Sequence, residues 1–423
     1  MTRAAMALRM LLSGILVIGI SGSSSLAQGQ TVNHDFTDLP PAGWTGPKFK
    51  LSDNYPATLP RLEPLSKRPW RQFDFKNPAE APKYLQAVLN YCLEGNTPDN
   101  FNDVATNSVR KWYHAPWLDT TARGREFIHG MTDERPSRVG ELGPAQTGGH
   151  DNWAVGFYNA RGGYTLGQVW KDINHPDPRK AVFPSNTVAC KLLFSTAPIT
   201  EVPFLDGSLE WQGDVHHSTG TGARPTLHLL QLDVAVKDSR ANTTTGWVFG
   251  TFQYEKAASA STNWWEHMVP VGLMWGSEVA QLKLDKPTTQ EWINTARGQK
   301  LHLGRHDLVL NGPIDNPLGS CTACHGYAQV ARVNNPAVKI PKNPPKDGAL
   351  AASLEPYFDN IKAATPLSPD YISLDYSLQL QLGISRALDA GATLPTNLNS
   401  VSHAAGHPRP PATHVEAVTR DSD

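Results

Sequence analysis

The chain has 423 residues, 18 % of them charged, and a formal net charge of −1 at pH 7. Such a balance excludes a strongly basic nucleic-acid-binding protein and gives no reason to expect attraction to an anionic membrane surface. The 34 glycines, 34 prolines and 12 tryptophans favour loops and short strands over a helical bundle.

The N-terminus predicts export. Arg3 and Arg9 precede an apolar run over residues 11–20, and small residues follow up to Ala27. This order is typical of a secretory signal peptide over residues 1–27, cleaved after Ala27. The alternative is an uncleaved membrane anchor, although the run is shorter than the roughly 20 apolar residues that span a bilayer. We therefore expect a mature chain that is not membrane-spanning and is periplasmic.

The next two segments are predicted to precede the main domain. Residues 28–76 are rich in proline and polar residues and predict an extended arm. Residues 77–150 predict a helical and aromatic extension, because apolar residues recur at helical spacing from Tyr84 to Cys92 after Pro78. Gly95 is placed to end that helix.

Strand patterns dominate from residue 151 to residue 333. Residues 153–158 and 164–170 flank Arg161, Gly162 and Gly163, which predicts a hairpin. Further strands are expected over residues 187–194 and 230–236, with the strand at 247–254 pairing with the latter. Residues 269–275 form a continuous apolar run that predicts a buried strand.

A Cys-x-x-Cys-His pattern follows, formed by Cys321, Cys324 and His325. It is the attachment pattern of a c-type haem, in which each thiol adds to one vinyl group and the histidine becomes the proximal iron ligand. Chance would place this pattern in such a chain roughly once in a thousand sequences of this composition. We predict one covalent haem c per chain, and its position behind a signal peptide agrees with attachment after export.

Two other chemistries compete for this motif. Half of a zinc site would need a second closely spaced ligand pair, which Cys92 and Cys190 do not form. A thioredoxin-like dithiol would need a strand-then-helix context that is absent from this region. In an oxidising compartment, Cys92 and Cys190 either form a disulfide or remain two separate buried cysteines.

The distal iron ligand is left open by the sequence. No methionine follows His325, so Met274, inside the apolar run, is the best methionine candidate, with ordinary core packing as the alternative. The histidine candidates lie upstream of the motif: they are His216, His217, His228 and His267. An iron without a distal protein ligand is the remaining option, and it would bind small molecules.

The C-terminal region completes an expected α+β fold. Residues 334–348 predict a proline- and lysine-rich linker, and residues 349–396 predict two helices, at 349–364 and 368–389. Residues 397–423 lack periodicity and predict a disordered tail. The prediction is a strand-rich haem domain with an N-terminal helical extension and two C-terminal helices.

Three stretches resemble the uncharacterised c-type cytochrome family proteins of proteobacteria. They are residues 247–252 (Trp-Val-Phe-Gly-Thr-Phe), 269–276 and 316–325. A second likeness, to β-sheet haem proteins such as cytochrome c′-beta and the hydroxylamine-oxidising cytochromes, rests on residues 183–188 and 246–249. The second likeness implies a haem against a β-sheet and a five-coordinate iron.

We therefore predict a monohaem c-type cytochrome that transfers electrons with a redox partner protein. The alternative is a haem enzyme or small-ligand sensor with an open distal iron, acting on a nitrogen oxide, hydroxylamine or peroxide. No nucleic acid partner is expected.

Overall fold

The computed structural model describes most of the chain between residues 54 and 398. The described residues are 54–96, 107–118, 120–121, 124–125, 131–213, 225–277, 288–295, 310, 312–313, 315, 319–332, 358–396 and 398. The signal peptide predicted for residues 1–27, the linker predicted for 334–348 and nearly all of the predicted tail lie outside these residues.

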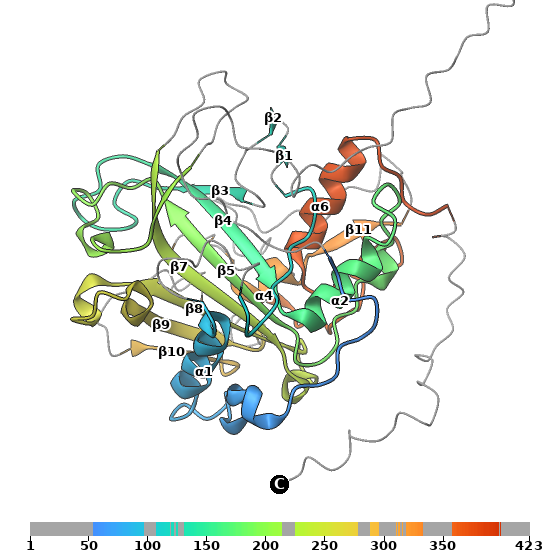
Figure 1. The fold of residues 1–423 in the computed structure, drawn as a ribbon, viewed down its shortest axis with the longest axis horizontal. Helices are drawn as coiled ribbons and strands as arrows, with labels where there is room; N and C mark the ends of the chain where they lie inside the picture. Colours follow the sequence, from blue (N-terminus) through green and yellow to red (C-terminus); the bar gives the residue numbers. More distant parts are fainter. Residues whose placement is uncertain are drawn as a thin grey trace, which may run out of the picture. The chain divides into compact units, whose positions relative to one another are not determined.

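The protein is an α+β protein, as predicted, built on one antiparallel sheet of eight strands (Figure 1). The strand order is β10-β9-β8-β7-β5-β4-β3, and β6 also pairs with β7. The strands are β3 (Thr132–Ser137), β4 (His150–Tyr158), β5 (Val188–Ser195), β6 (Glu210–Gln212), β7 (Thr226–Lys237), β8 (Trp247–Tyr254), β9 (Met268–Met274) and β10 (Glu291–Ile293). The predicted strands at 187–194, 230–236 and 269–275 are confirmed, and so is the pairing of the strand at 247–254 with β7.

The two sides of this sheet carry different side chains, because successive residues of a strand point to opposite faces. One row across the sheet consists of Phe157, Cys190, Val234, Gly250 and Leu273. Helix α1 (Ala81–Leu93) covers this side, which we name the α1 face: a Cβ on Gly250 would meet Leu85 Cδ2 at 2.2 Å. The predicted helix with Tyr84 and Cys92 is thereby confirmed, and Gly95 follows it with a φ of +82°.

A disulfide fixes α1 to this face. Cys92 on α1 is bonded to Cys190 on β5, which resolves the alternatives that the sequence left open. Both cysteines are fully buried within the apolar cluster between the helix and the sheet. The bond links residues that are 98 positions apart, so it ties the N-terminal extension to the centre of the sheet.

The opposite side of the sheet, which we name the α4 face, has one apolar row and one polar row. The apolar row is Tyr158, Ala189, Ala235, Phe249 and Met274. The neighbouring row is Gly156, Lys191, Asp233, Thr251 and Gly272. Helix α4 (Cys321–His325) packs on this side, because the His325 ring lies 4.8 Å from the ring of Phe249, whose neighbour Gly250 faces α1.

The hairpin predicted around Arg161 is wrong. Its first strand exists within β4, but residues Ala160–Val169 form helix α2. Asn159 starts the helix by accepting a hydrogen bond from the Gly162 backbone N–H, a strong N-cap signal. Gly163 favours tight packing of this helix, because a Cβ there would lie 2.5 Å from the Tyr113 ring.

The C-terminal helices also differ from the prediction. Helix α6 (Leu378–Asp389) begins ten residues later than expected, capped by the Ser377 side chain. Before it, strand β12 (Tyr371–Ser373) pairs with β11 (Gln329–Ala331), directly after α4. Most of the helix predicted at 349–364 lies outside the described residues, and its described part, 358–364, is not an α-helix. A separate two-stranded sheet is formed by β1 (Thr120–Thr121) and β2 (Gly124–Arg125).

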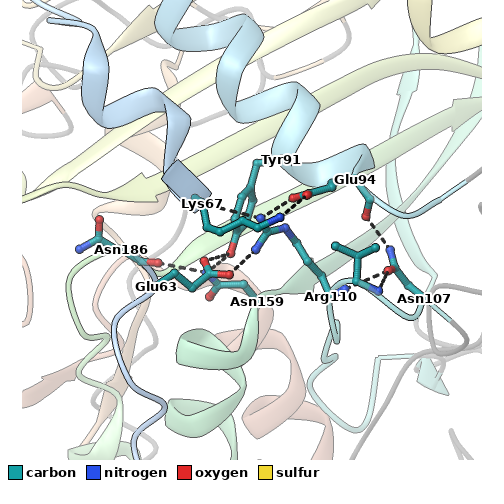
Figure 2. A network of polar contacts seen from close by, with 9 residues as sticks. Glu63, Lys67, Tyr91, Glu94, Asn107, Arg110, Asn159 and Asn186 are labelled. Carbon is teal, nitrogen blue, oxygen red and sulfur yellow. Dashed lines mark hydrogen bonds and ion pairs between the residues drawn. The ribbon is translucent and has the colours of Figure 1, made fainter. Parts of the chain in front are cut away.

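The predicted arm over residues 28–76 is described from residue 54, where it contacts α1. Arg110 connects the two: its guanidinium lies 3.5 Å from the centre of the Tyr91 ring and pairs with Glu63 and Glu94 (Figure 2). The Tyr91 hydroxyl donates to Glu63 at 3.0 Å and accepts from Asn159. No helix within the described residues is long and apolar enough to cross a membrane.

Candidate functional site

The Cys-x-x-Cys-His motif forms one short helix, α4. Ser320 caps α4, because its hydroxyl accepts a hydrogen bond from the Ala323 backbone N–H at 3.0 Å. Thr322 and Ala323 are buried against the core, whereas Cys321, Cys324 and His325 keep part of their accessible surface. His325 nevertheless packs against Phe249 of the sheet, and Cys321 packs against the same apolar cluster.

The two cysteines of the motif are free thiols and are not bonded to each other. Burial raises the pKa of Cys324 to about 12 and also raises the pKa of Cys321, where the nearby Asp315 and Asp233 carboxylates add to the effect. A catalytic dithiol needs the reverse, a lowered thiol pKa that supplies thiolate. This electrostatic setting does not favour the thioredoxin-like alternative.

The imidazole of His325 is oriented by one backbone carbonyl. Its Nδ1 lies 2.8 Å from the carbonyl oxygen of Tyr376, which can only accept, so the Nδ1 proton is assigned from this contact. In the described part of the chain, His325 makes no hydrogen bond through Nε2. Burial lowers the pKa of His325 to about 4, so the ring is neutral at pH 7. A neutral imidazole with its proton on Nδ1 keeps the Nε2 lone pair for a metal.

Two kinds of side chain surround this histidine and the thiols. The Phe249 ring, from β8, lies 4.8 Å from the His325 ring, and the Tyr376 ring lies 5.9 Å from that of Phe249. The polar row of the α4 face contributes Lys191, whose Nζ lies 3.6 Å from both Asp233 and Glu134. The motif thus lies where the apolar row of the α4 face meets the polar row.

Two carboxylates lie close to the Gln231 amide: Asp233, which belongs to the polar row, and Asp315, which precedes the motif. The Gln231 amide donates to Asp233 at 2.8 and 2.9 Å and to Asp315 at 3.2 Å. Burial and the charge of Asp315 raise the pKa of Asp233 to about 6, despite the attraction of Lys191. Both carboxylates have further partners, since Asp233 lies 3.6 Å from Lys191 Nζ and Asp315 accepts from the Gly312 backbone N–H at 3.0 Å.

Met274, the methionine candidate for the distal position, lies on the core side of α4. It is fully buried, and its sulfur is 3.9 Å from the Thr322 hydroxyl, between the two cysteines of the motif. This position favours a packing role, while the ligand role stays a prediction. Core packing alone explains why Met274 lies next to the motif.

The two histidine candidates within the described residues, His228 and His267, make their contacts with other residues than His325. His267 has Nδ1 3.0 Å from the Lys256 carbonyl and Nε2 2.7 Å from the Ser261 carbonyl, and it stacks on Tyr254. His228 is buried on β7 beside Glu210, at 3.7 Å. His216 and His217 lie outside the described residues.

Several residues around the motif were missed in the sequence. Lys191 and Asp233 are ordinary alternating residues of their strands, and only the strand pairing brings them to the α4 face. The carbonyl of Tyr376 comes from a residue 51 positions after His325, and a backbone acceptor has no sequence signal. The zinc alternative loses its remaining thiols, because Cys92 and Cys190 are bonded to each other.

Comparison with known proteins adds no relative. No family model matches the chain, and no curated protein and no solved structure matches it. The resemblances of residues 247–252, 269–276 and 316–325 to c-type cytochromes, and the weaker likeness to β-sheet haem proteins, therefore stay predictions. A function for this chain therefore has to be inferred from the site around Cys321, Cys324 and His325.

Proposed function

We propose that this chain is an exported monohaem c-type cytochrome that exchanges electrons with a redox partner protein. Cys321 and Cys324 would hold the haem through thioethers, and His325 would be the proximal iron ligand. The observation that carries the proposal is the contact of His325 Nδ1 with the Tyr376 carbonyl, which leaves Nε2 with a lone pair on the same short helix as two free thiols.

The residues fit this cofactor in three respects. The thiols are unpaired, and they lie on one helical turn with two residues between them. The histidine is neutral, and its Nδ1 acceptor increases the basicity of the other nitrogen. The aromatic ring of Phe249 packs against the His325 ring, and Tyr376 packs against Phe249. When bound, haem supplies reversible one-electron chemistry at its iron.

Export to a periplasm is part of the proposal, and the disulfide supports it. The bond between Cys92 and Cys190 is of a kind that persists in oxidising compartments and is rare in a reducing cytosol. The basic and apolar residues of the predicted signal peptide, 1–27, point the same way. Both features support a location in which covalent haem attachment takes place in bacteria.

A second candidate function is a haem enzyme or small-ligand sensor with an open distal iron. The supporting observation is that Met274 and His267, two of the candidate distal ligands, make other contacts. An iron that lacks a sixth protein ligand would bind small nitrogen or oxygen species directly. His228 and the two histidines outside the described residues remain the competing ligands.

The first experiment tests covalent attachment. The full chain is expressed with its leader in a periplasm with haem-maturation capacity, denatured, and stained on a gel for haem-dependent peroxidase activity. We expect a stained band for the wild type and no band for the double variant Cys321→Ala, Cys324→Ala. Thr322→Ser, which changes an intervening residue and keeps both thiols, should stain like the wild type. An unstained wild-type band would refute the proposal.

The second experiment separates the two candidate functions. The optical spectrum of the reduced protein is measured with and without carbon monoxide. A low-spin spectrum that carbon monoxide does not change is expected for an electron carrier with two protein ligands. A high-spin spectrum that changes on binding would instead support the open iron site.

A further inference from the structure

The carbonyl that contacts His325 belongs to an unusual turn. Asp375 and Tyr376, between β12 and α6, are consecutive non-glycine residues with φ values of +49° and +71°. L-residues rarely adopt this conformation, and two in succession persist only where the surrounding contacts hold them. Such strained turns concentrate at functional sites, so the contacts that hold this one are informative.

Three donors from three parts of the chain hold the side chain of Asp375, which is fully buried. Its Oδ1 accepts hydrogen bonds from Lys237 Nζ at 2.6 Å and from Trp247 Nε1 at 3.1 Å. Its Oδ2 accepts one from the Phe183 backbone N–H at 2.7 Å. The carboxylate thereby joins the turn to β7, to β8 and to the segment before β5.

The residues around Asp375 are held as well. The Leu374 backbone N–H donates to the Ala328 carbonyl at 2.8 Å, close after the motif. The Ser377 hydroxyl lies 2.8 Å from the Tyr158 hydroxyl, and the Tyr376 hydroxyl donates to the Ile361 carbonyl. With both flanks fixed, the carbonyl of Tyr376 has one direction left, which is toward His325 Nδ1.

We propose that Asp375 is a positioning residue for the iron ligand: it anchors the strained turn that aims the Tyr376 carbonyl at His325 and so fixes the tautomer of the imidazole. The inference rests on the proposed function only in naming His325 as the ligand. Asp375 acts through the backbone and touches neither the motif nor the cofactor. By keeping the Nδ1 acceptor in place, Asp375 would make His325 Nε2 a stronger electron-pair donor to the iron, which would favour the oxidised state.

The first readout is the tautomer of His325 in the full chain without haem, measured by nitrogen NMR on histidine-labelled protein. The His325→Gln spectrum identifies the signal among the 15 histidines. We expect the Nδ1–H form to dominate in the wild type. In Asp375→Ala the ratio of Nδ1–H to Nε2–H should fall about tenfold, the equivalent of about one net hydrogen bond. Asp375→Asn, which keeps the size but not the charge, should fall between the two.

The second readout is the reduction potential of the haem-loaded full chain, which decides the matter if a haem-free variant does not fold. We expect a higher potential in Asp375→Ala and in Asp375→Asn than in the wild type. The matched control is Asp370→Asn, which removes the charge of an exposed aspartate just before β12, and its potential and tautomer should stay at the wild-type values.

The outcomes separate this inference from the proposed function. An unchanged tautomer and an unchanged potential in both Asp375 variants would overturn the positioning role, even if haem is attached. An equal shift in Asp370→Asn would overturn it too, because the loss of any aspartate charge in this region would then explain the result. A wild-type chain without covalent haem would refute the proposed function, and the tautomer measurement would still decide whether Asp375 positions His325.

Discussion

The two faces of the sheet are built by different means. On the α1 face, apolar side chains of α1 pack against rows of apolar strand residues, and the bond between Cys92 and Cys190 holds the layers together. The α4 face carries free thiols, a buried ion pair between Lys237 and Asp375 at 2.6 Å, and a partly buried charged row. A buried carboxylate lies beside α1 as well, since Asp238 accepts from the Tyr84 hydroxyl and pairs with Arg71, but the free thiols and the strained turn belong to the α4 face.

This difference indicates which face serves function. Buried charges and positive φ values at non-glycine residues reduce stability unless neighbouring contacts compensate for them, and departures from local rules are expected at functional sites. On the α4 face they include the buried ion pair of Lys237 and Asp375 and the consecutive positive φ values of Asp375 and Tyr376, next to the carbonyl that contacts His325. Changes on the α1 face should therefore affect stability alone, whereas changes on the α4 face that move His325 or the Tyr376 carbonyl should also affect the cofactor.

Removing the disulfide should have the largest effect on stability. In the double variant Cys92→Ala, Cys190→Ala we expect the free energy of unfolding to fall by about 4 to 5 kcal/mol, because the bond closes a loop of 98 residues in the unfolded chain. Urea unfolding at low temperature measures the change. At that temperature the folded variant should keep the haem spectrum of the wild type. A changed spectrum would show that the two faces are not independent.

The sequence predicted the α1 face well, because its signals are periodic. Apolar residues at helical spacing predicted α1, and alternation predicted β7 and its partner β8. The disulfide stayed open because spacing along the chain does not give the distance between Cys92 and Cys190 in space. The hairpin failed because a glycine pair was interpreted as a turn, whereas Asn159 is an N-cap and the glycines permit close helix packing.

The α4 face was predictable only at its covalent motif. The pattern of Cys321, Cys324 and His325 is local in sequence, and these residues form one short helix. Nothing local indicates that the Tyr376 carbonyl reaches His325, or that Asp375 adopts a positive φ, since aspartate occurs far more often with a negative one. Both features depend on contacts between segments that are far apart in the chain.

Asp233 should make stability depend on pH. Its pKa is about 6 in the folded chain and near 3.8 when unfolded, so between about pH 4 and 6 the folded state holds a proton that the unfolded state has lost. The carboxyl therefore contributes stability at low pH that is lost as pH rises, by up to about 1.4 kcal/mol per pH unit. His325 opposes this trend, because its folded pKa is lowered to about 4.

The variant Asp233→Asn isolates this contribution. Urea unfolding from pH 4 to pH 7 should show that the difference in unfolding free energy, variant minus wild type, grows with pH up to about pH 6 and then stays constant. Asp370→Asn is the control, since Asp370 is exposed and its backbone carbonyl accepts from the Arg332 N–H, a contact outside the motif. A difference that does not change with pH would mean that Asp233 is already ionised at pH 4.

The smallest change is expected from Met274→Leu, and it tests the division between the faces most directly. The substitution conserves volume, so the free energy of unfolding should change by less than about 1.5 kcal/mol. Met131→Leu is the matched control, because Met131 is equally buried but belongs to the apolar cluster of the α1 face. Both variants should keep the optical spectrum of the wild type, since the sulfur of Met274 contacts the Thr322 hydroxyl on the core side of α4. A change from low-spin to high-spin iron in Met274→Leu alone would make Met274 the distal ligand, and it would favour the electron carrier over the open iron site.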